Sequence, residues 1–421
     1  MHSPHSIIHK YQKLTTFRFV LIVIVLFIAF CGWSSIDLGI EGWSSKPAFF
    51  IGSVIFFLVV INKNDIKSGT MQSTAIWTLV AASLSYIPAI IDWNASSASF
   101  LYNYIATYYG LAFYFLLSIW KVAPKDIIRI LVFFCLIWVI IEIGQQFTYP
   151  TYWFLGRNNG NGSIENRMGL WRFYIWGIDF VMLLASYYIG RLVSKNKLHR
   201  KDIIFTIAFS IGILCYCSRK HIICLIIAYI YAVLEAKSKH KWTIRIAFIL
   251  LFIVLFFSFY YDFSMMNAEQ SEGQGKGEEW VRFLSGKFYL TKFSDSPLYP
   301  FFGTGWGSLT LYFKINTIES NFGLFRSDIG ILGYYSSVGA VGVSAIIMYI
   351  YKFISNWKYI DLGYRLFFIM KIFMIIFDFW MMWAIGIIAF GTFLYLLDQN
   401  IKKNKIISNI RKNEHRNTHI L

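Results

Sequence analysis

Long apolar segments alternate with short polar ones along most of the 421-residue chain. Several approach or exceed the roughly 18 to 20 residues that cross the hydrocarbon core of a bilayer. The pattern predicts about twelve spans, the last two drawn from one apolar block too long for a single crossing. The expected ranges are 17–33, 47–61, 71–91, 100–120, 127–147, 169–193, 203–218, 221–236, 246–263, 329–354, 365–382 and 384–398. We expect an all-α polytopic membrane protein with one domain over residues 1–421.

Composition supports this class, because 57% of the residues are hydrophobic and only 14% are charged, against about 25% charged in soluble proteins. Lys10 and Lys13 precede the first apolar segment as in a signal peptide, but no small-residue cleavage site follows, so we expect a retained helix. All five cysteines fall in apolar segments, which favours core packing over disulfide or metal roles. They are Cys31, Cys135, Cys215, Cys217 and Cys224.

The formal net charge of +17 is distributed along the chain in alternation. If the N-terminus is cytoplasmic, every second connection is rich in Lys and Arg, which is the positive-inside pattern. The basic segments are 63–67, 121–125, 191–201, 237–245, 358–365 and a C-terminal tail at 399–421. Both termini are therefore predicted to be cytoplasmic. Most of the positive charge is a topology signal, which leaves no reason to predict nucleic-acid binding.

Two predicted outer segments do not follow that pattern. Residues 148–168 are rich in turn formers, and residues 264–328 form a large outer loop of about 65 residues. Within the large loop, Trp280 to Leu290 is predicted to be an amphipathic helix lying on the membrane.

Cations gather at the predicted outer face, where positive-inside sorting does not explain them. They are Arg219 and Lys220 at the turn between the seventh and eighth spans, Arg167 and Arg172 at the start of the sixth, and Arg282 and Arg326 in the large loop. Acidic residues at similar depth are Glu142, Asp179, Glu319 and Asp328. Since arginine offers a planar fork for phosphate oxygens, the set favours a phosphate-bearing substrate. No metal-ligand motif occurs, so no metal site is predicted.

Structural roles are open alternatives for several of these charges. Asp179 follows Arg172 by two helical turns, so the two side chains could form an ion pair, and Lys371 and Asp378 have the same spacing. Glu142 could cap a helix or form a pair within the bundle.

Lys220 and the aromatic residues also have two interpretations. Lys220 either snorkels to the headgroups or binds phosphate. Trp306 either anchors the chain at the interface or stacks on a sugar ring. The glycines of Gly303-Thr-Gly-Trp-Gly307 either form a simple turn or approach a phosphate closely.

Five motifs together resemble the bacterial O-antigen polymerase and O-antigen ligase family. The large loop carries Glu-Glu-Trp-Val-Arg282, then Ser-Pro-Leu-Tyr-Pro-Phe-Phe-Gly-Thr-Gly-Trp-Gly307, then Arg-Ser-Asp328-Ile-Gly-Ile-Leu-Gly. Cys-Ser-Arg219-Lys resembles the family's "SRg" turn, and Gly-Leu-Trp-Arg172 resembles an arginine after its middle outer loop. The resemblance covers residues 150–345 and implies a membrane glycosyltransferase with a GT-C-like fold in the bacterial inner membrane.

The implied activity is polymerisation of lipid-linked repeat units of O-antigen, capsule or exopolysaccharide. A growing glycan would leave undecaprenyl pyrophosphate and join an incoming lipid-linked unit, without ATP, metal or another cofactor. The implied sites are Arg219 and Arg282 at the pyrophosphate and Asp328 or Glu319 as acceptor base. Assisting residues are Arg172, Arg326, Lys220, Arg167 and Trp306. Candidate partners are membrane lipids, a chain-length regulator and a flippase.

Three other functions compete with this one. O-antigen ligases carry a histidine before the "GilG" segment, and the large loop here contains none, which favours the polymerase. A flippase or exporter would line a central cavity with charge and would need no sizeable outer domain. An acyltransferase would place His or Arg pairs on the inner side, where only generic Lys-rich clusters occur.

Overall fold

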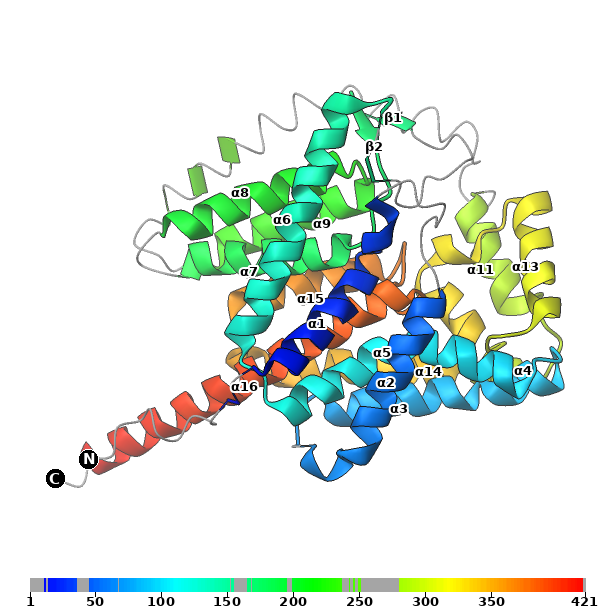
Figure 1. Ribbon diagram of the computed structural model, residues 1–421, viewed down its shortest axis with the longest axis horizontal. Helices are drawn as coiled ribbons and strands as arrows, with labels where there is room; N and C mark the ends of the chain where they lie inside the picture. The colour runs from blue at the N-terminus through cyan, green and yellow to red at the C-terminus, as the bar shows by residue number, and fades with distance from the viewer. Residues whose placement is uncertain are drawn as a thin grey trace.

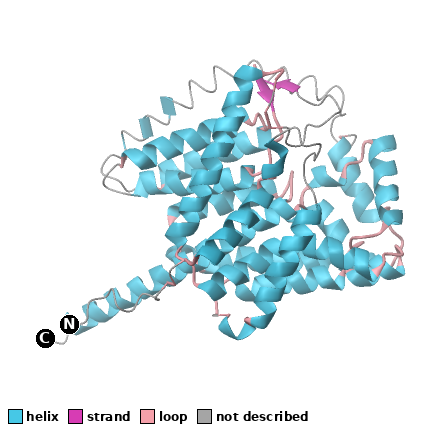
Figure 2. Ribbon diagram, viewed as in Figure 1, coloured by secondary structure: helices cyan, strands magenta, loops and turns pink. Residues whose placement is uncertain are grey.

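Helices make up almost all of the described chain (Figures 1 and 2). The computed structural model describes residues 11–12, 14–35, 45–66, 68–151, 153–154, 165–167, 169–194, 199–236, 242, 245–246, 249–250 and 280–418. The α-helices are α1 (Thr16–Ala29), α2 (Ser45–Ile61), α3 (Gln72–Leu84), α4 (Tyr86–Ile91), α5 (Ser97–Trp120), α6 (Pro124–Thr148), α7 (Ile178–Ser194), α8 (Arg200–Cys215), α9 (Arg219–Leu234), α11 (Val281–Thr291), α12 (Tyr299–Phe302), α13 (Leu309–Phe322), α14 (Ile331–Ser355), α15 (Leu362–Met374) and α16 (Ala384–Thr418). The 3-10 helices are η2 (Gly32–Ser35), η3 (Lys63–Asp65), η5 (Arg326–Ile329), η6 (Trp357–Tyr359) and η7 (Trp380–Met382), and an antiparallel hairpin pairs β1 (Glu165–Arg167) with β2 (Leu170–Arg172).

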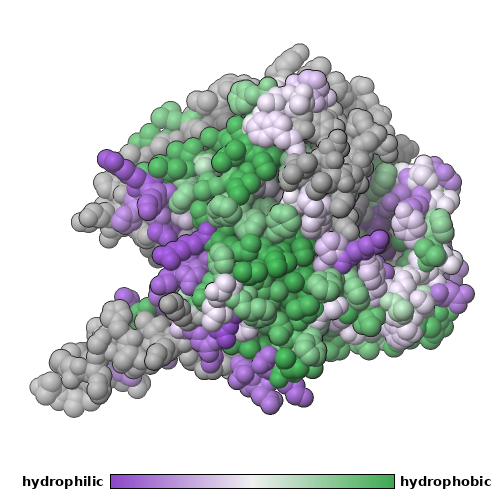
Figure 3. Space-filling model, in the orientation of Figure 1, coloured by the Kyte–Doolittle hydropathy of each residue, from purple (hydrophilic) through white to green (hydrophobic). Residues whose placement is uncertain are grey.

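Among the described residues, four helical segments are long and apolar enough to cross a membrane. They are Gln72–Ile91, Pro124–Thr148, Ile331–Ser355 and Ala384–Arg411. Large apolar side chains face outward on the helices, for example Phe50 (72% exposed), Phe133 (61%) and Ile347 (62%). Figure 3 shows a continuous hydrophobic area across the middle of one face, with hydrophilic residues gathered near the base of α16. These are the features of an all-helical membrane protein.

Most predicted spans coincide with helices, but three boundaries were wrong. Residues 71–91 form α3 and α4, which break at Ser85; Pro88, three residues on, has no N–H to donate to the carbonyl of Leu84. The predicted sixth span at 169–193 begins with the hairpin, and its helix starts only at Ile178. The eleventh, predicted at 365–382, leaves the helix after Met374. Nearly all of the ninth, 246–263, lies outside the described residues.

Small residues bring the central helices close together. A Cβ added to Gly110 of α5 would lie 2.4 Å from the Cα of Ile388 in α16, and one on Gly391 would lie 2.0 Å from the carbonyl oxygen of Gly110. Helices α7 and α15 cross in the same way, because a Cβ on Gly190 would lie 2.2 Å from the backbone nitrogen of Gly363. In a bilayer, such close backbone contact is a main source of helix association.

Residues 280–329, which we call the helical lobe, have a hydrophobic core of their own. Trp93 packs into this core from outside the lobe, and the other buried members are Tyr289, Phe293, Tyr299, Leu311, Ile315, Ile318 and Ile329. Figure 1 shows α11 and α13 standing together at the side of the bundle opposite the projecting α16. The predicted helix at 280–290 is confirmed as α11.

The glycine-rich turn at 303–307 packs against the bundle. The N–H groups of Thr304 and Gly305 donate to the carbonyls of Ser336 and Ser337 in α14, at 2.9 and 3.0 Å. A few residues on, α14 is kinked at Gly339 (φ 63°), where a Cβ would lie 2.2 Å from the carbonyl oxygen of Phe301. Because the N–H groups of Thr304 and Gly305 are already bonded, this contact favours the simple-turn interpretation over phosphate binding.

The basic end of the bundle is held together around α16. The predicted tail at 399–421 is not separate, because α16 runs unbroken through to Thr418. Asn400 of α16 bonds Asp361, and Asn404 bonds the carbonyl of Tyr359 at 2.9 Å. Lys352 of α14 donates to the carbonyl of Thr70 at 2.9 Å. The basic connections near residues 70 and 360 therefore lie on the same side as the basic part of α16.

Candidate functional site

The connection between two predicted spans, at residues 216–218, is a tight turn, as expected. Helix α8 ends at Cys215 and α9 begins at Arg219, with Cys217 in the left-handed region (φ 50°). Arg219 and Lys220, both half-buried, form the first turn of α9. His221 is buried, with its Nδ1 2.8 Å from Ser218 Oγ. This turn lies at the opposite end of α8 from Arg200, so its cations are far from the basic residues Arg200 and Lys201 at the start of that helix.

Two ion pairs connect elements around this turn, and both differ from the predicted pairs. Lys220 pairs with Asp378, which follows α15. Lys371 of α15, only 1% exposed, pairs with Asp179 at the start of α7. The predicted pairs Arg172–Asp179 and Lys371–Asp378 were wrong, because Arg172 lies in β2 and Asp378 lies beyond the end of α15, so neither pair shares the helix that the spacing assumed. Both aspartates pair with lysines of other elements instead. Lys220 makes a salt bridge within the protein, and the snorkelling and phosphate-binding interpretations both stay predictions.

The hairpin carries Arg172 to the same turn. The side-chain amide of Gln146 in α6 bonds both backbone groups of Trp171, at 2.7 and 2.8 Å, which fixes the hairpin to the bundle. Next to it, the Arg172 guanidinium lies 4.0 Å from the ring centroid of Tyr174. Arg167 lies in β1 opposite Leu170, and its side chain is outside the described part of the structure.

Tyr216 is the centre of this arrangement. Its hydroxyl interacts electrostatically with Arg172, Glu142 and Asp378. Its ring packs edge-on against the ring of His221, with the two centroids 5.2 Å apart. We define the turn cluster as Tyr216, with Arg172 and Asp378, whose charges act on its hydroxyl, together with Arg219 and Lys220 in the first turn of α9. It joins a strand, a helix start and the segment after α15, which are far apart in sequence.

Glu142 of α6 lies behind the turn cluster. It is fully buried, and neither carboxylate oxygen has a hydrogen-bond partner among the described residues. The predicted cap or pair for Glu142 is therefore not seen in this part of the chain.

The helical lobe contains a second charged group, centred on Arg326. Its Nη1 atom is buried without a hydrogen-bond partner in the described chain, and its backbone N–H donates to Glu319 Oε1 at 3.1 Å. Burial lowers the pKa of Arg326, while Tyr289, Glu319 and Tyr299 act in the opposite direction. Burial has the opposite effect on a tyrosine, whose neutral form it favours, and it raises the pKa of Tyr289 to about 12. A desolvated guanidinium with an unused donor is well suited to binding an anion.

The remaining predicted residues lie at the edge of this lobe. Asp328 is exposed and accepts a hydrogen bond from Ser327 at 3.3 Å. Arg282 of α11 lies 5.7 Å from the ring centroid of Trp280. Trp306 is half-buried and packs edge-on against Tyr108 of α5 at 5.5 Å, so much of its ring is used in internal packing.

Residues 375–382 border both charged groups. The N–H of Ile331, three residues after Asp328, donates to the carbonyl of Ile375 at 2.8 Å. Asp378, from the same segment, pairs with Lys220. This short segment therefore contacts both the chain directly after the lobe and the turn cluster, and we take the turn cluster and the lobe together as the candidate site.

Three participants gave no usable signal in the sequence. Asp378 is 158 residues from Lys220, and Tyr216 and Gln146 belong to no motif. Within the described chain, no group of three or more His, Cys, Asp or Glu is placed to hold a metal ion. No protein-family model matches the chain, and no curated protein matches it.

Proposed function

We propose that the protein is a polymerase of lipid-linked oligosaccharide repeat units, acting at the outer face of the membrane. The observation that carries the proposal is the grouping of cations at one turn: Arg219 and Lys220 begin α9, and Arg172 of β2 acts on Tyr216 directly after α8, at the end of these helices remote from the basic connections. Such a cluster suits a substrate with several negative charges, and pyrophosphate is one.

The proposed chemistry requires a leaving group and a base. An acceptor hydroxyl attacks the anomeric carbon of the growing glycan, the bond from that carbon to the pyrophosphate oxygen breaks, and the hydroxyl proton passes to a carboxylate. The released undecaprenyl pyrophosphate gains negative charge, which Arg219 and Arg172 stabilise. Asp328 is the better base, since it is exposed, whereas Glu319 already accepts the N–H of Arg326.

We propose the number of crossings and the orientation in the membrane together with this activity. Shorter helices such as α8 and α9 would complete about twelve crossings in a GT-C-like arrangement, with both termini in the cytoplasm of a bacterium and the site in the periplasm. What supports this is the grouping of basic connections around α16 and the position of the lobe at the opposite side (Figure 1).

The test is replacement of Arg219 by Ala in the host, with the length of surface glycan examined on gels. Removing one preorganised donor from developing negative charge lowers rates by about 100- to 1000-fold, so single-repeat glycan should replace the ladder. Arg200→Ala, at the far end of α8, is the matched control and should give full ladders. Arg219→Lys should fall between them because it keeps the charge and loses the fork.

Three results would reject the proposal. Full ladders from Arg219→Ala at normal expression would show that the turn cluster is not the site. Accumulation of inward-facing lipid-linked units after deletion of the gene would identify an exporter instead. Attachment of single units to the lipid A core by this protein, with the length of the polymer unchanged in its absence, would identify a ligase.

A further inference from the structure

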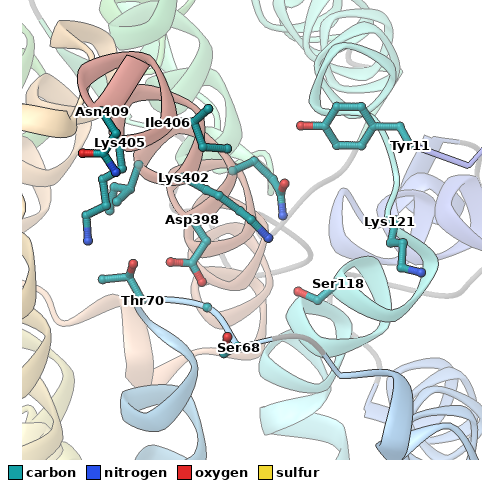
Figure 4. Close-up of a pocket in the computed structure, with 13 residues that line it drawn as sticks. Tyr11, Ser68, Thr70, Ser118, Lys121, Asp398, Lys402, Lys405, Ile406 and Asn409 are labelled. Atoms are coloured by element: carbon teal, nitrogen blue, oxygen red, sulfur yellow. The ribbon is translucent and has the colours of Figure 1, made fainter. Parts of the chain in front are cut away.

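A pocket of about 290 Å³ lies at the basic end of the bundle, away from the candidate site. One wall is a face of α16, formed by Asp398, Lys402, Lys405 and Asn409 at helical spacing, and the rest comes from the end of α5, the segment before α3 and Tyr11 (Figure 4). Lys121 closes α5 in the left-handed conformation and also lines the pocket. Four distant parts of the chain thus build one concavity.

The lining carries more positive than negative charge. Its ammonium groups are those of Lys121, Lys402 and Lys405, against the single carboxylate of Asp398. Both oxygens of that carboxylate already accept hydrogen bonds inside the protein, one from the N–H of Met71 at 3.0 Å and one from the Tyr114 hydroxyl. The pocket therefore retains a net positive charge after its own acid is counted.

The pocket wall is held in place before any ligand arrives. Asp398 fixes the backbone at Met71, and Lys352 donates to the carbonyl of Thr70 at 2.9 Å. Gly69 permits this close packing, because a Cβ there would lie 2.2 Å from Asp398 Oδ2. Ser68, Thr70 and Ser118 add hydroxyl groups to the lining. Cations and hydroxyl groups on a fixed frame are the donors that bind a phosphate group.

The position of the pocket indicates where the phosphate comes from. Helix α16 is apolar and buried up to Leu397 and then becomes basic, so the pocket lies where the helix leaves the apolar bundle. Basic pockets between helices at this level bind the headgroups of anionic lipids. We propose that this pocket binds the phosphate group of an anionic headgroup, independently of the reaction proposed at the other end of the protein.

The test uses the purified full-length protein and two lipids with the same acyl chains, phosphatidylglycerol and phosphatidylcholine, with binding measured by native mass spectrometry. The pocket variant is Lys402→Gln/Lys405→Gln. The matched control is Lys403→Gln/Arg411→Gln, which removes two exposed charges from the same helix. The pocket variant should bind phosphatidylglycerol about 30-fold more weakly, equivalent to about 2 kcal/mol for two headgroup contacts, and the control less than about 3-fold.

Competition with millimolar inorganic phosphate distinguishes the two sources of the ligand. Failure of phosphate to displace phosphatidylglycerol from the wild type would assign the site to the lipid, whereas displacement would assign it to phosphate-bearing anions in general. Equal losses in the pocket and control variants would overturn the proposal, because general surface attraction would then explain the binding. Equal affinity of the wild type for the two lipids would overturn it as well.

Discussion

The buried ion pair between Lys371 and Asp179 gives the sharpest prediction about stability. Lys371 is 1% exposed and Asp179 is 14% exposed, and they join α15 to α7. Lys371→Met leaves the aspartate carboxylate buried without its partner, which costs about 3 to 5 kcal/mol. The double variant Lys371→Met/Asp179→Leu removes both charges, so its unfolding free energy should return to within about 1 kcal/mol of wild type.

The measurement is the free energy of unfolding in mild detergent as a denaturing detergent is titrated in. An exposed pair on α6 provides the control: Arg129, 75% exposed, lies 3.5 Å from Asp126, and Arg129→Met should cost less than about 0.5 kcal/mol. A loss below about 1 kcal/mol in Lys371→Met, or a double variant as unstable as the single one, would refute the assignment of a desolvated pair.

Two further predictions concern the kink of α14 and the turn cluster. Gly339→Ala should cost more than about 3 kcal/mol of unfolding free energy, because a positive φ and a 2.2 Å contact combine there; Gly323→Ala, at φ 65° with open space around it, should cost about 1 kcal/mol. Equal costs in that comparison would contradict the packing argument. Asp378→Asn should release the charge of Lys220 and lower the KM for the lipid-linked donor about fivefold in liposomes, equivalent to about 1 kcal/mol. An unchanged or higher KM would remove Lys220 from the proposed pyrophosphate site.

Local patterns in the sequence predicted the helices well. Apolar length gave α5, α6 and α14 almost to their ends, and the interruption at Arg219 marked the turn between α8 and α9. Amphipathic spacing in the large loop gave α11. These features depend on neighbours within a few turns, so they can be recognised without tertiary information.

Long-range partners could not be predicted in this way. Lys371 and Asp179 are 192 residues apart, and a helical spacing argument assigned each of them to a nearer charge. The hairpin was missed because its strands are three residues long and lie beside an apolar run. The grouping of charged residues around Tyr216 likewise depends on how four separate elements pack. It could therefore be recognised only once the fold was known.

The two ion pairs of the α15 region limit how the bundle can move. Lys371 ties α15 to α7, and Asp378 ties the segment after α15 to α9. Transporters work by rocking one group of helices against another. A rocking motion that separated α15 from these neighbours would pull both charge pairs apart, at a cost of several kcal/mol for the buried one. The arrangement favours a static frame, which agrees with the proposal that lipid-linked substrates are brought to a fixed site.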